Sequence, residues 1–150
     1  MTTLEHVRTL YPQMVETRRH IHQHPELSFQ EFETSKFISQ QLTDMGVENS
    51  IIATTGVVAH IGSGQRCVAL RADIDALPIT EETGLAYASQ NPGVMHACGH
   101  DTHTTMLLTA ARVLKANESN LNGIVKLLFQ PGEEKTPGGA SIMIEQGALQ

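Results

Sequence analysis

The order of apolar segments in the second half of the chain is the feature that most limits its fold. A short, nearly all-apolar segment at 67–70 precedes a helical pattern at 102–116, an apolar strand at 124–129 and a further helix starting near Gly139. Strand, helix and strand in this order are typical of a parallel pair joined by a right-handed crossover. An apolar run without alternation also predicts that the segment at 67–70 is buried on both faces. The pattern therefore predicts an α/β domain.

Two helices and a hairpin are expected ahead of this unit. Apolar residues recur at helical spacing over 4–22, and Pro25 ends that helix because the residue before a proline is pushed out of the α region. A second helix is expected over about 30–45. Two β-rich runs within 51–61, split by a Thr-Gly pair, predict a β-hairpin.

Charge and cysteine content exclude several classes of protein. Ten basic and sixteen acidic residues give a net charge of -6 without a basic cluster, so a nucleic-acid footprint is missing. No apolar run approaches the length of a membrane span, and the first residues lack an export signal, which predicts a cytoplasmic protein without a membrane partner. Two cysteines do not make the disulfide framework of a small secreted domain.

Three polar clusters are expected just past the carboxyl ends of predicted strands. They are residues 71–75, 96–101 and 130–134. The carboxyl ends of strands in an open α/β sheet form the edge where ligands bind, so we expect the clusters to meet in space. The irregular stretch from about 73 to 100 supports this view, because a loop of this length in a compact domain is usually functional.

The middle cluster contains two side chains suited to a transition metal. The Cys98 thiolate and the His100 imidazole are ligands for zinc, cobalt, nickel or manganese, and Gly99 lets the backbone turn so that both face one ion. Asp101 is expected to cap the following helix or to orient a ligand histidine. One alternative is a buried structural cysteine beside a capping aspartate. Another is a nucleophilic Cys98 with His96 or His100 as its base.

Glu133 and Glu134 form the second chemical argument. Consecutive residues at a strand end point in different directions, so one carboxylate can bind metal while its neighbour faces substrate. The alternative is a solvated acidic turn. The position directly after the apolar residues 127–129 favours the functional interpretation.

The motifs at these clusters closely resemble those of the M20 family of metallo-amidohydrolases and peptidases. The nearest branch contains bacterial N-acyl-amino-acid amidohydrolases, hippurate hydrolases and plant auxin-conjugate hydrolases. The resemblance rests on four segments in order: RRHIHQHPELS at 18–28, ALRADIDALP at 69–78, HACGHD at 96–101 and FQPGEE at 129–134. It extends over nearly the whole chain.

The resemblance implies a role for each residue of the site. Cys98 would bridge two divalent metal ions as a thiolate, His100 would bind one of them, and Glu134 would be a further ligand. Glu133 would be the general base. The ions would be drawn from manganese, zinc, cobalt and nickel.

The resemblance also implies the fold. It places residues 1–150 in the N-terminal part of a three-layer zinc-peptidase-like catalytic domain with a mixed, mainly parallel sheet. Family members run well over twice this length, and the remainder supplies two further histidine ligands and an inserted lid domain that can form a homodimer. Asp73 falls where the wider family has an aspartate that supports a ligand histidine, and Arg71 occupies the position of that histidine.

The expected activity is hydrolysis of the amide bond of an N-acyl amino acid, a small-molecule substrate. A dipeptidase or carboxypeptidase of the same family is the neighbouring alternative. A truncated, non-catalytic remnant is the alternative from another class, because only three of about five expected ligands lie in this chain. A thiol-dependent enzyme would keep its activity in chelators and lose it when Cys98 is alkylated.

Overall fold

The chain forms four α-helices and four strands over residues 2–150, the part that this computed structural model describes. The elements in chain order are α1 (Thr3–Gln23), α2 (Phe32–Asp44), β1 (Asn49–Ile52), β2 (Gly56–Ser63), β3 (Cys67–Asp73), α3 (His100–Ala116), a 3-10 turn (Glu118–Asn120), β4 (Gly123–Gln130) and α4 (Gly139–Glu145). The predicted helices, hairpin and crossover unit are confirmed, with boundaries that differ by a few residues.

The four strands form one mixed sheet in the order β1-β2-β4-β3. The prediction that this sheet is mainly parallel is wrong. Strands β1 and β2 pair antiparallel, β2 and β4 also pair antiparallel, and only β3 and β4 run parallel. The reason lies in the connections, because the chain contains one crossover through α3, whereas a tight turn joins the hairpin strands.

Strand β3 lies at the edge of the sheet, and the expectation that both of its faces are buried is also wrong. Val68 is 59% exposed and Leu70 is 39% exposed. Within residues 2–150 this strand pairs with β4 alone, so its other edge has no partner strand. Only its last two residues, Ala72 and Asp73, are buried.

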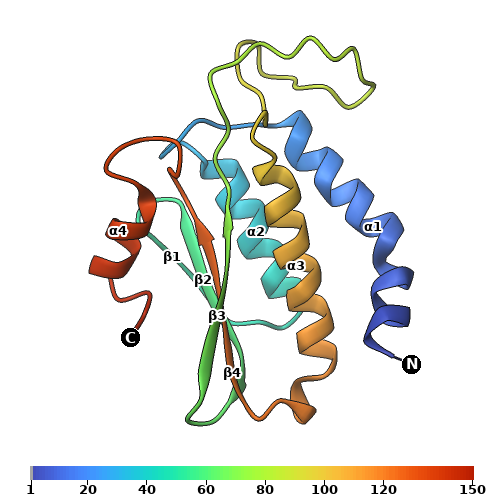
Figure 1. Cartoon of the computed structure of the whole chain (residues 1–150), viewed down its shortest axis with the longest axis vertical. Helices are drawn as coiled ribbons and strands as arrows, with labels where there is room; N and C mark the ends of the chain where they lie inside the picture. The colour runs from blue at the N-terminus through green and yellow to red at the C-terminus, as the bar shows by residue number, and fades with distance from the viewer. Residues whose placement is uncertain (1) are drawn as a thin grey trace.

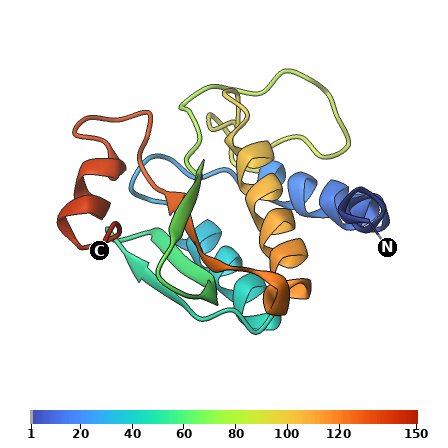
Figure 2. The same ribbon diagram turned by 60° about the horizontal axis from the view of Figure 1, so that its bottom comes forward.

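Helices cover both faces of the sheet. Figure 1 shows α2 and α3 on one face, α4 on the other, and α1 packed outside α3, and the same layers are visible in the turned view of Figure 2. The main core joins Leu42 of α2 and Leu107 of α3 to Phe129 at the centre of the sheet, and a smaller core joins Leu128 to Met143 under α4. No helix within residues 2–150 combines the length and the apolar character needed to cross a bilayer.

The segment between β3 and α3, residues 74–99, forms the irregular loop at the top of Figure 1. A backbone bridge between Leu77 and Met95 closes the loop on itself. A second bridge, between Leu27 and Ala76, ties it to the turn that joins α1 to α2. The loop therefore begins at the end of β3 and ends at the start of α3.

Candidate functional site

The three polar clusters meet at one edge of the sheet, as the sequence predicts. The parallel pairing of β3 and β4 brings the ends of these two strands side by side, with Asp73 opposite Gln130. The third cluster joins them through the start of α3. Gly99, with a φ of 97°, occupies the left-handed region and turns the chain into this helix, so Cys98 and His100 approach the same point.

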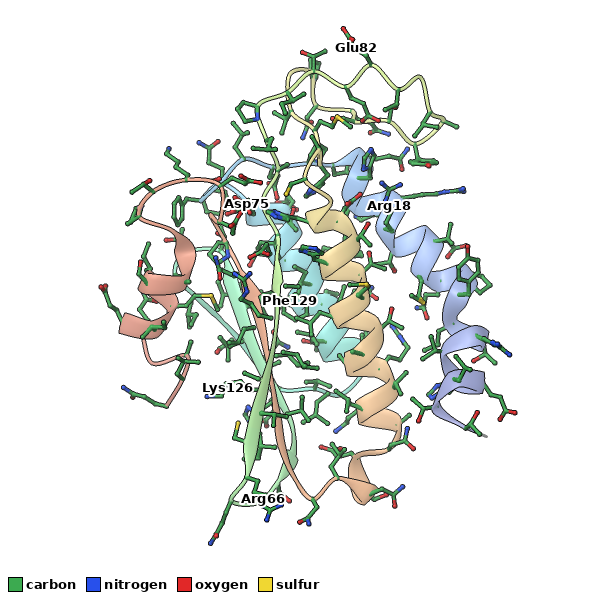
Figure 3. The ribbon with its side chains drawn as sticks, viewed as in Figure 1. Arg18, Arg66, Asp75, Glu82, Lys126 and Phe129 are labelled. Carbon is green, nitrogen blue, oxygen red and sulfur yellow. The ribbon has the colours of Figure 1, made fainter. Side chains whose placement is uncertain are left out.

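His100 is held in one orientation by Asp75. The Nδ1–H of this buried imidazole donates to the Asp75 carbonyl oxygen at 2.9 Å and to Oδ1 at 3.1 Å. The second carboxylate oxygen of Asp75 accepts from Ser28 Oγ at 2.7 Å and from the Glu134 backbone N–H at 3.0 Å. Figure 3 shows Asp75 at the upper end of β3 beside the start of α3. The remaining nitrogen of His100, Nε2, is therefore free to bind a ligand.

Charge and burial oppose each other in the Asp75–His100 pair. Burial raises the pKa of Asp75, but the hydrogen bonds from His100, Glu134 and Ser28 outweigh it and lower the pKa to about 2. Burial lowers the pKa of His100, but the hydrogen bonds and charge of Asp75 raise it to about 9. A cation that binds Nε2 must displace a proton that this pair holds firmly.

Asp73, the aspartate that the family resemblance points out, does not orient His100. Asp73 makes no hydrogen bond to His100, and its Oδ2 lies 4.0 Å from Nε2, on the ligand side of the ring. Asp75 is the aspartate that supports the histidine. The sequence places both carboxylates of the segment Asp73-Ile74-Asp75 near the end of the strand. It does not show which of the two supports His100.

Cys98 and Glu134 lie beside His100. The Cys98 Sγ, a His100 nitrogen and a Glu134 oxygen all lie within 4.8 Å of one another. The pKa of the thiol is raised, first by its hydrogen bond with Glu134, then by burial and by the charges of Glu134, Glu133 and Asp73. A thiolate among these carboxylates needs a positive charge to offset them, and the donor set fits a divalent transition-metal ion.

Glu133 and Glu134 lie on a turn whose backbone N–H groups donate to two buried carboxylates. The Gly132 N–H donates to Glu31 Oε1 at 2.8 Å, and the Glu134 N–H donates to Asp75. Glu133 lies between these two amides. Its side chain is 42% exposed, and its Oε2 lies 3.9 Å from His100 Nε2. The site therefore presents a carboxylate to solvent beside the metal-ligand candidates, on a backbone that is held at both neighbours.

Glu31 is a functional residue that sequence reasoning missed. Its carboxyl is fully buried, and its second oxygen accepts from Thr55 Oγ1 at 2.6 Å. Burial raises the pKa of Glu31 despite hydrogen bonds with Thr55 and Gly132. Phe29 packs beneath the same turn, since a Cβ built on Gly132 would lie 2.4 Å from its ring. No local pattern marks a glutamate at a helix start as buried.

Asp101 is not the N-cap residue of α3 and orients no ligand histidine, which corrects both expectations for it, although its Oδ1 accepts from the Thr102 N–H in the first turn at 2.8 Å. Gly99 is the N-cap residue. The Asp101 carboxylate lies 2.8 Å from Arg18 Nε and 2.7 Å from Nδ1 of the buried His22. His22 Nε2 in turn lies 3.1 Å from Glu81 Oε1. Asp101 therefore joins α3 to α1 and, through His22, to the loop.

The geometry does not favour a thiol nucleophile. His96 is buried, and neither of its ring nitrogens has a hydrogen-bond partner among the described residues. Burial, the largest influence, lowers the pKa of His96 to about 4. His100 directs Nδ1 at Asp75. The raised pKa of Cys98 is the opposite of what an activated nucleophile requires.

Comparisons with known proteins converge on one family. Residues 69–150 match the family described as Peptidase family M20/M25/M40. The N-acetyl-L-cysteine deacetylase of Bacillus subtilis (strain 168) is 53% identical over 144 residues, which are 94% of this chain and 34% of the relative. The N-acyl-L-amino acid amidohydrolase of Geobacillus stearothermophilus is 49% identical, over 88% of this chain and 36% of the relative.

A solved structure shares the fold. The Bacillus subtilis YXEP protein, described as a dinuclear metal binding peptidase from the M20 family, superimposes with a TM-score of 0.90 at 42% identity. The match covers 95% of this chain and 41% of that protein. The chain thus spans about a third of the length of the curated relatives it matches.

Proposed function

The chain belongs to peptidase family M20/M25/M40, and from that premise we propose that it is part of a metal-dependent amidohydrolase acting on N-acyl amino acids. The observation that carries the proposal is the grouping of Cys98, His100 and Glu134, in which Asp75 engages Nδ1 of the histidine and leaves Nε2 free. The substrate class is supported by relatives at about half identity, which are a deacetylase and an amidohydrolase of N-acyl amino acids.

Cys98, His100 and Glu134 would hold the metal in this proposal. The description of the related YXEP protein supports a dinuclear centre. Cys98 would then be the ligand that both ions share, since a thiolate can bind two ions. His100 would bind through Nε2, since Nδ1 is engaged by Asp75. The donors would accept zinc, cobalt, nickel or manganese.

Glu133 is the proposed general base. When bound, the metal ions would supply a water whose pKa falls from about 15.7 towards about 7 and would polarise the amide carbonyl. Glu133 takes a proton from the attacking water and passes it to the nitrogen of the leaving amine, so that the C–N bond breaks to a carboxylic acid and an amine. Its partial exposure lets a substrate reach it, and the fixed turn holds it in place.

Glu133→Gln in the complete protein tests the base. General bases contribute about 10²–10⁴-fold to a rate, so we expect kcat to fall by about that factor. The metal content, measured by inductively coupled plasma mass spectrometry, should be unchanged. Cys98→Ala should lose metal. Glu82→Gln, on the exposed outer part of the loop in Figure 3, is the matched control and should leave both quantities unchanged. Wild-type turnover by the Glu133 variant contradicts the assignment.

A peptidase is the second candidate, favoured by the description of the YXEP protein. The two activities share the reaction at the amide carbon and differ in the group on its acyl side. A panel that compares N-acetyl amino acids with dipeptides separates them through kcat/KM. Higher kcat/KM on dipeptides would replace the amidohydrolase proposal with the peptidase.

A further inference from the structure

A second group of metal-ligand side chains surrounds His100 and shares only that residue with Cys98 and Glu134. It consists of Asp73 at the end of β3 and of His100 and His103, one turn apart on α3. One ligand atom from each lies within 4.8 Å of the others. The two imidazoles face the same side because residues three apart are neighbours on a helix. Their rings lie 5.4 Å apart between centroids.

The spacing within this group suits a shared cation better than direct hydrogen bonds. Asp73 Oδ2 lies 3.5 Å from His103 Nδ1 and 4.0 Å from His100 Nε2. A charge-assisted hydrogen bond would bring such atoms to about 2.7–2.9 Å. Two ligands at about 2.1 Å from a tetrahedral zinc lie about 3.4 Å apart, which is close to the first distance and within a small movement of the second.

Arg71 holds Asp73 in place through an ion pair that involves both carboxylate oxygens. Arg71 NH1 lies 2.8 Å from Asp73 Oδ1, and Arg71 NH2 also donates to Oδ2 at 3.3 Å. The guanidinium is fixed in turn by Gln130 Oε1 at 2.5 Å. Oδ2 is the oxygen that lies near both imidazoles, and Asp73 is 6% exposed, so its position is set by its surroundings.

Solvent reaches this group from outside the site described above. His103 is 47% exposed and lines a surface hollow of about 380 Å³ together with Asp73, Leu70 and Met106. An ion can therefore reach Asp73 and His103 from the edge of the sheet. Two imidazoles and one carboxylate leave further coordination positions for water, which is the arrangement of an open site.

We propose that Asp73, His100 and His103 form a further binding site for a divalent transition-metal ion, which competes with the Cys98–Glu134 site for His100. The competition follows from the histidine itself, because Asp75 occupies Nδ1 and leaves Nε2 as the one nitrogen that an ion can bind. Metal binding at this site goes beyond the proposed function and does not depend on it, whereas the competition for His100 rests on metal binding by Cys98 and Glu134 as proposed above. Its consequence is that excess metal draws His100 away from Cys98.

Cobalt binding to the 150-residue chain tests the site through a thiolate signal. Cys98→Ala removes the thiolate, so bound Co²⁺ should show ligand-field absorption without a thiolate-to-cobalt band. Adding His103→Ala should weaken Co²⁺ binding about tenfold or more, measured by calorimetry. Adding His60→Ala, an exposed histidine on β2, is the matched control and should change nothing. Circular dichroism checks that every variant is folded.

A second variant is designed to gain an absorption band, because misfolding can cause a loss of Co²⁺ binding but not a new thiolate-to-cobalt band. His103→Cys in the Cys98→Ala chain should restore a thiolate-to-cobalt band, because the new thiol would replace an imidazole at the ion. The proposal is overturned if Cys98→Ala binds no Co²⁺, if His103→Ala leaves its affinity unchanged, or if His103→Cys yields no band. None of these outcomes bears on Glu133, so failure here is distinct from failure of the amidohydrolase proposal.

Discussion

Replacing Glu31 by leucine tests how the turn before Glu133 is held. Leucine keeps much of the side-chain volume but accepts no hydrogen bond, so the Thr55 hydroxyl and the Gly132 N–H lose the acceptor they share. Both donors are buried. Each unsatisfied buried donor costs about 1–3 kcal/mol, so the free energy of unfolding should fall by about 2–6 kcal/mol. The lower half of this range is favoured because leucine also removes a buried carboxyl.

Urea unfolding followed by far-ultraviolet circular dichroism measures this change, since the chain contains no tryptophan. Glu33→Leu is the matched control, because Glu33 lies on the same turn of α2 and its side chain is 77% exposed. A surface substitution of this kind should stay within about 0.5 kcal/mol of wild type. Equal losses in the two variants would refute the reasoning that Glu31 supports the turn.

Glu31→Gln separates the charge from the hydrogen bonds. The amide oxygen still accepts from Gly132, and the amide group can donate to Thr55 Oγ1. Because burial raises the pKa of Glu31 above 4.5, its contribution to stability is full below that pH and is lost as the pH rises through the folded-state pKa. Glutamine has no such loss. Its cost relative to wild type should therefore be smaller near pH 7 than near pH 4, about the ordinary pKa of a glutamate.

Three further substitutions address the turn and the histidine pair. Gly138→Ala is the control without a clash: its φ is 84° and no atom lies within 4 Å of the new Cβ, so backbone strain alone should cost about 1–3 kcal/mol in the same urea assay. Gly132→Ala should lower the free energy of unfolding further, because its φ is 56° and the new Cβ also meets the Phe29 ring. Asp75→Asn should destabilise the protein most between pH 3.8 and pH 6.5, the ordinary pKa values of the two groups. Asp75 contributes stability above pH 3.8 that is lost as the pH falls through its folded-state pKa of about 2. His100 contributes stability below pH 6.5 that is lost as the pH rises through its folded-state pKa of about 9. A flat difference across urea titrations at several pH values would contradict the paired assignment.

Local patterns predict the helices and strands of this fold, but they do not predict which strands pair in the sheet. The helical spacing of apolar residues fixes α2 and α3, and the crossover order fixes the parallel pair of β3 and β4. The antiparallel pairing of β2 with β4 joins strands separated by β3 and α3, and no local pattern encodes it. The exposure of β3 has the same origin, because its apolar sequence is typical of a central strand while its position is at an edge.

The candidate site shows a similar division. Strand direction alone brings the clusters at 71–75 and 130–134 together, and the cluster at 96–101 joins them through the start of α3. The functions of Asp75 and Glu31 could not be read from the sequence, because each depends on partners remote along the chain. Glu31 resembles any glutamate at the start of a helix until Thr55 and Gly132 are placed on its two oxygens.

The turn that carries Glu133 also has a consequence for the order of folding. Its two supporting hydrogen bonds join residues 101 and 59 positions apart, from Glu31 to Gly132 and from Asp75 to Glu134. Contacts of such separation form only after the loop-closure entropy between them has been overcome, so they belong to the slow part of folding. During synthesis Glu31 must wait for the chain to reach Gly132. A nascent chain can therefore contain Cys98 and His100 well before the turn that positions Glu133 is fixed.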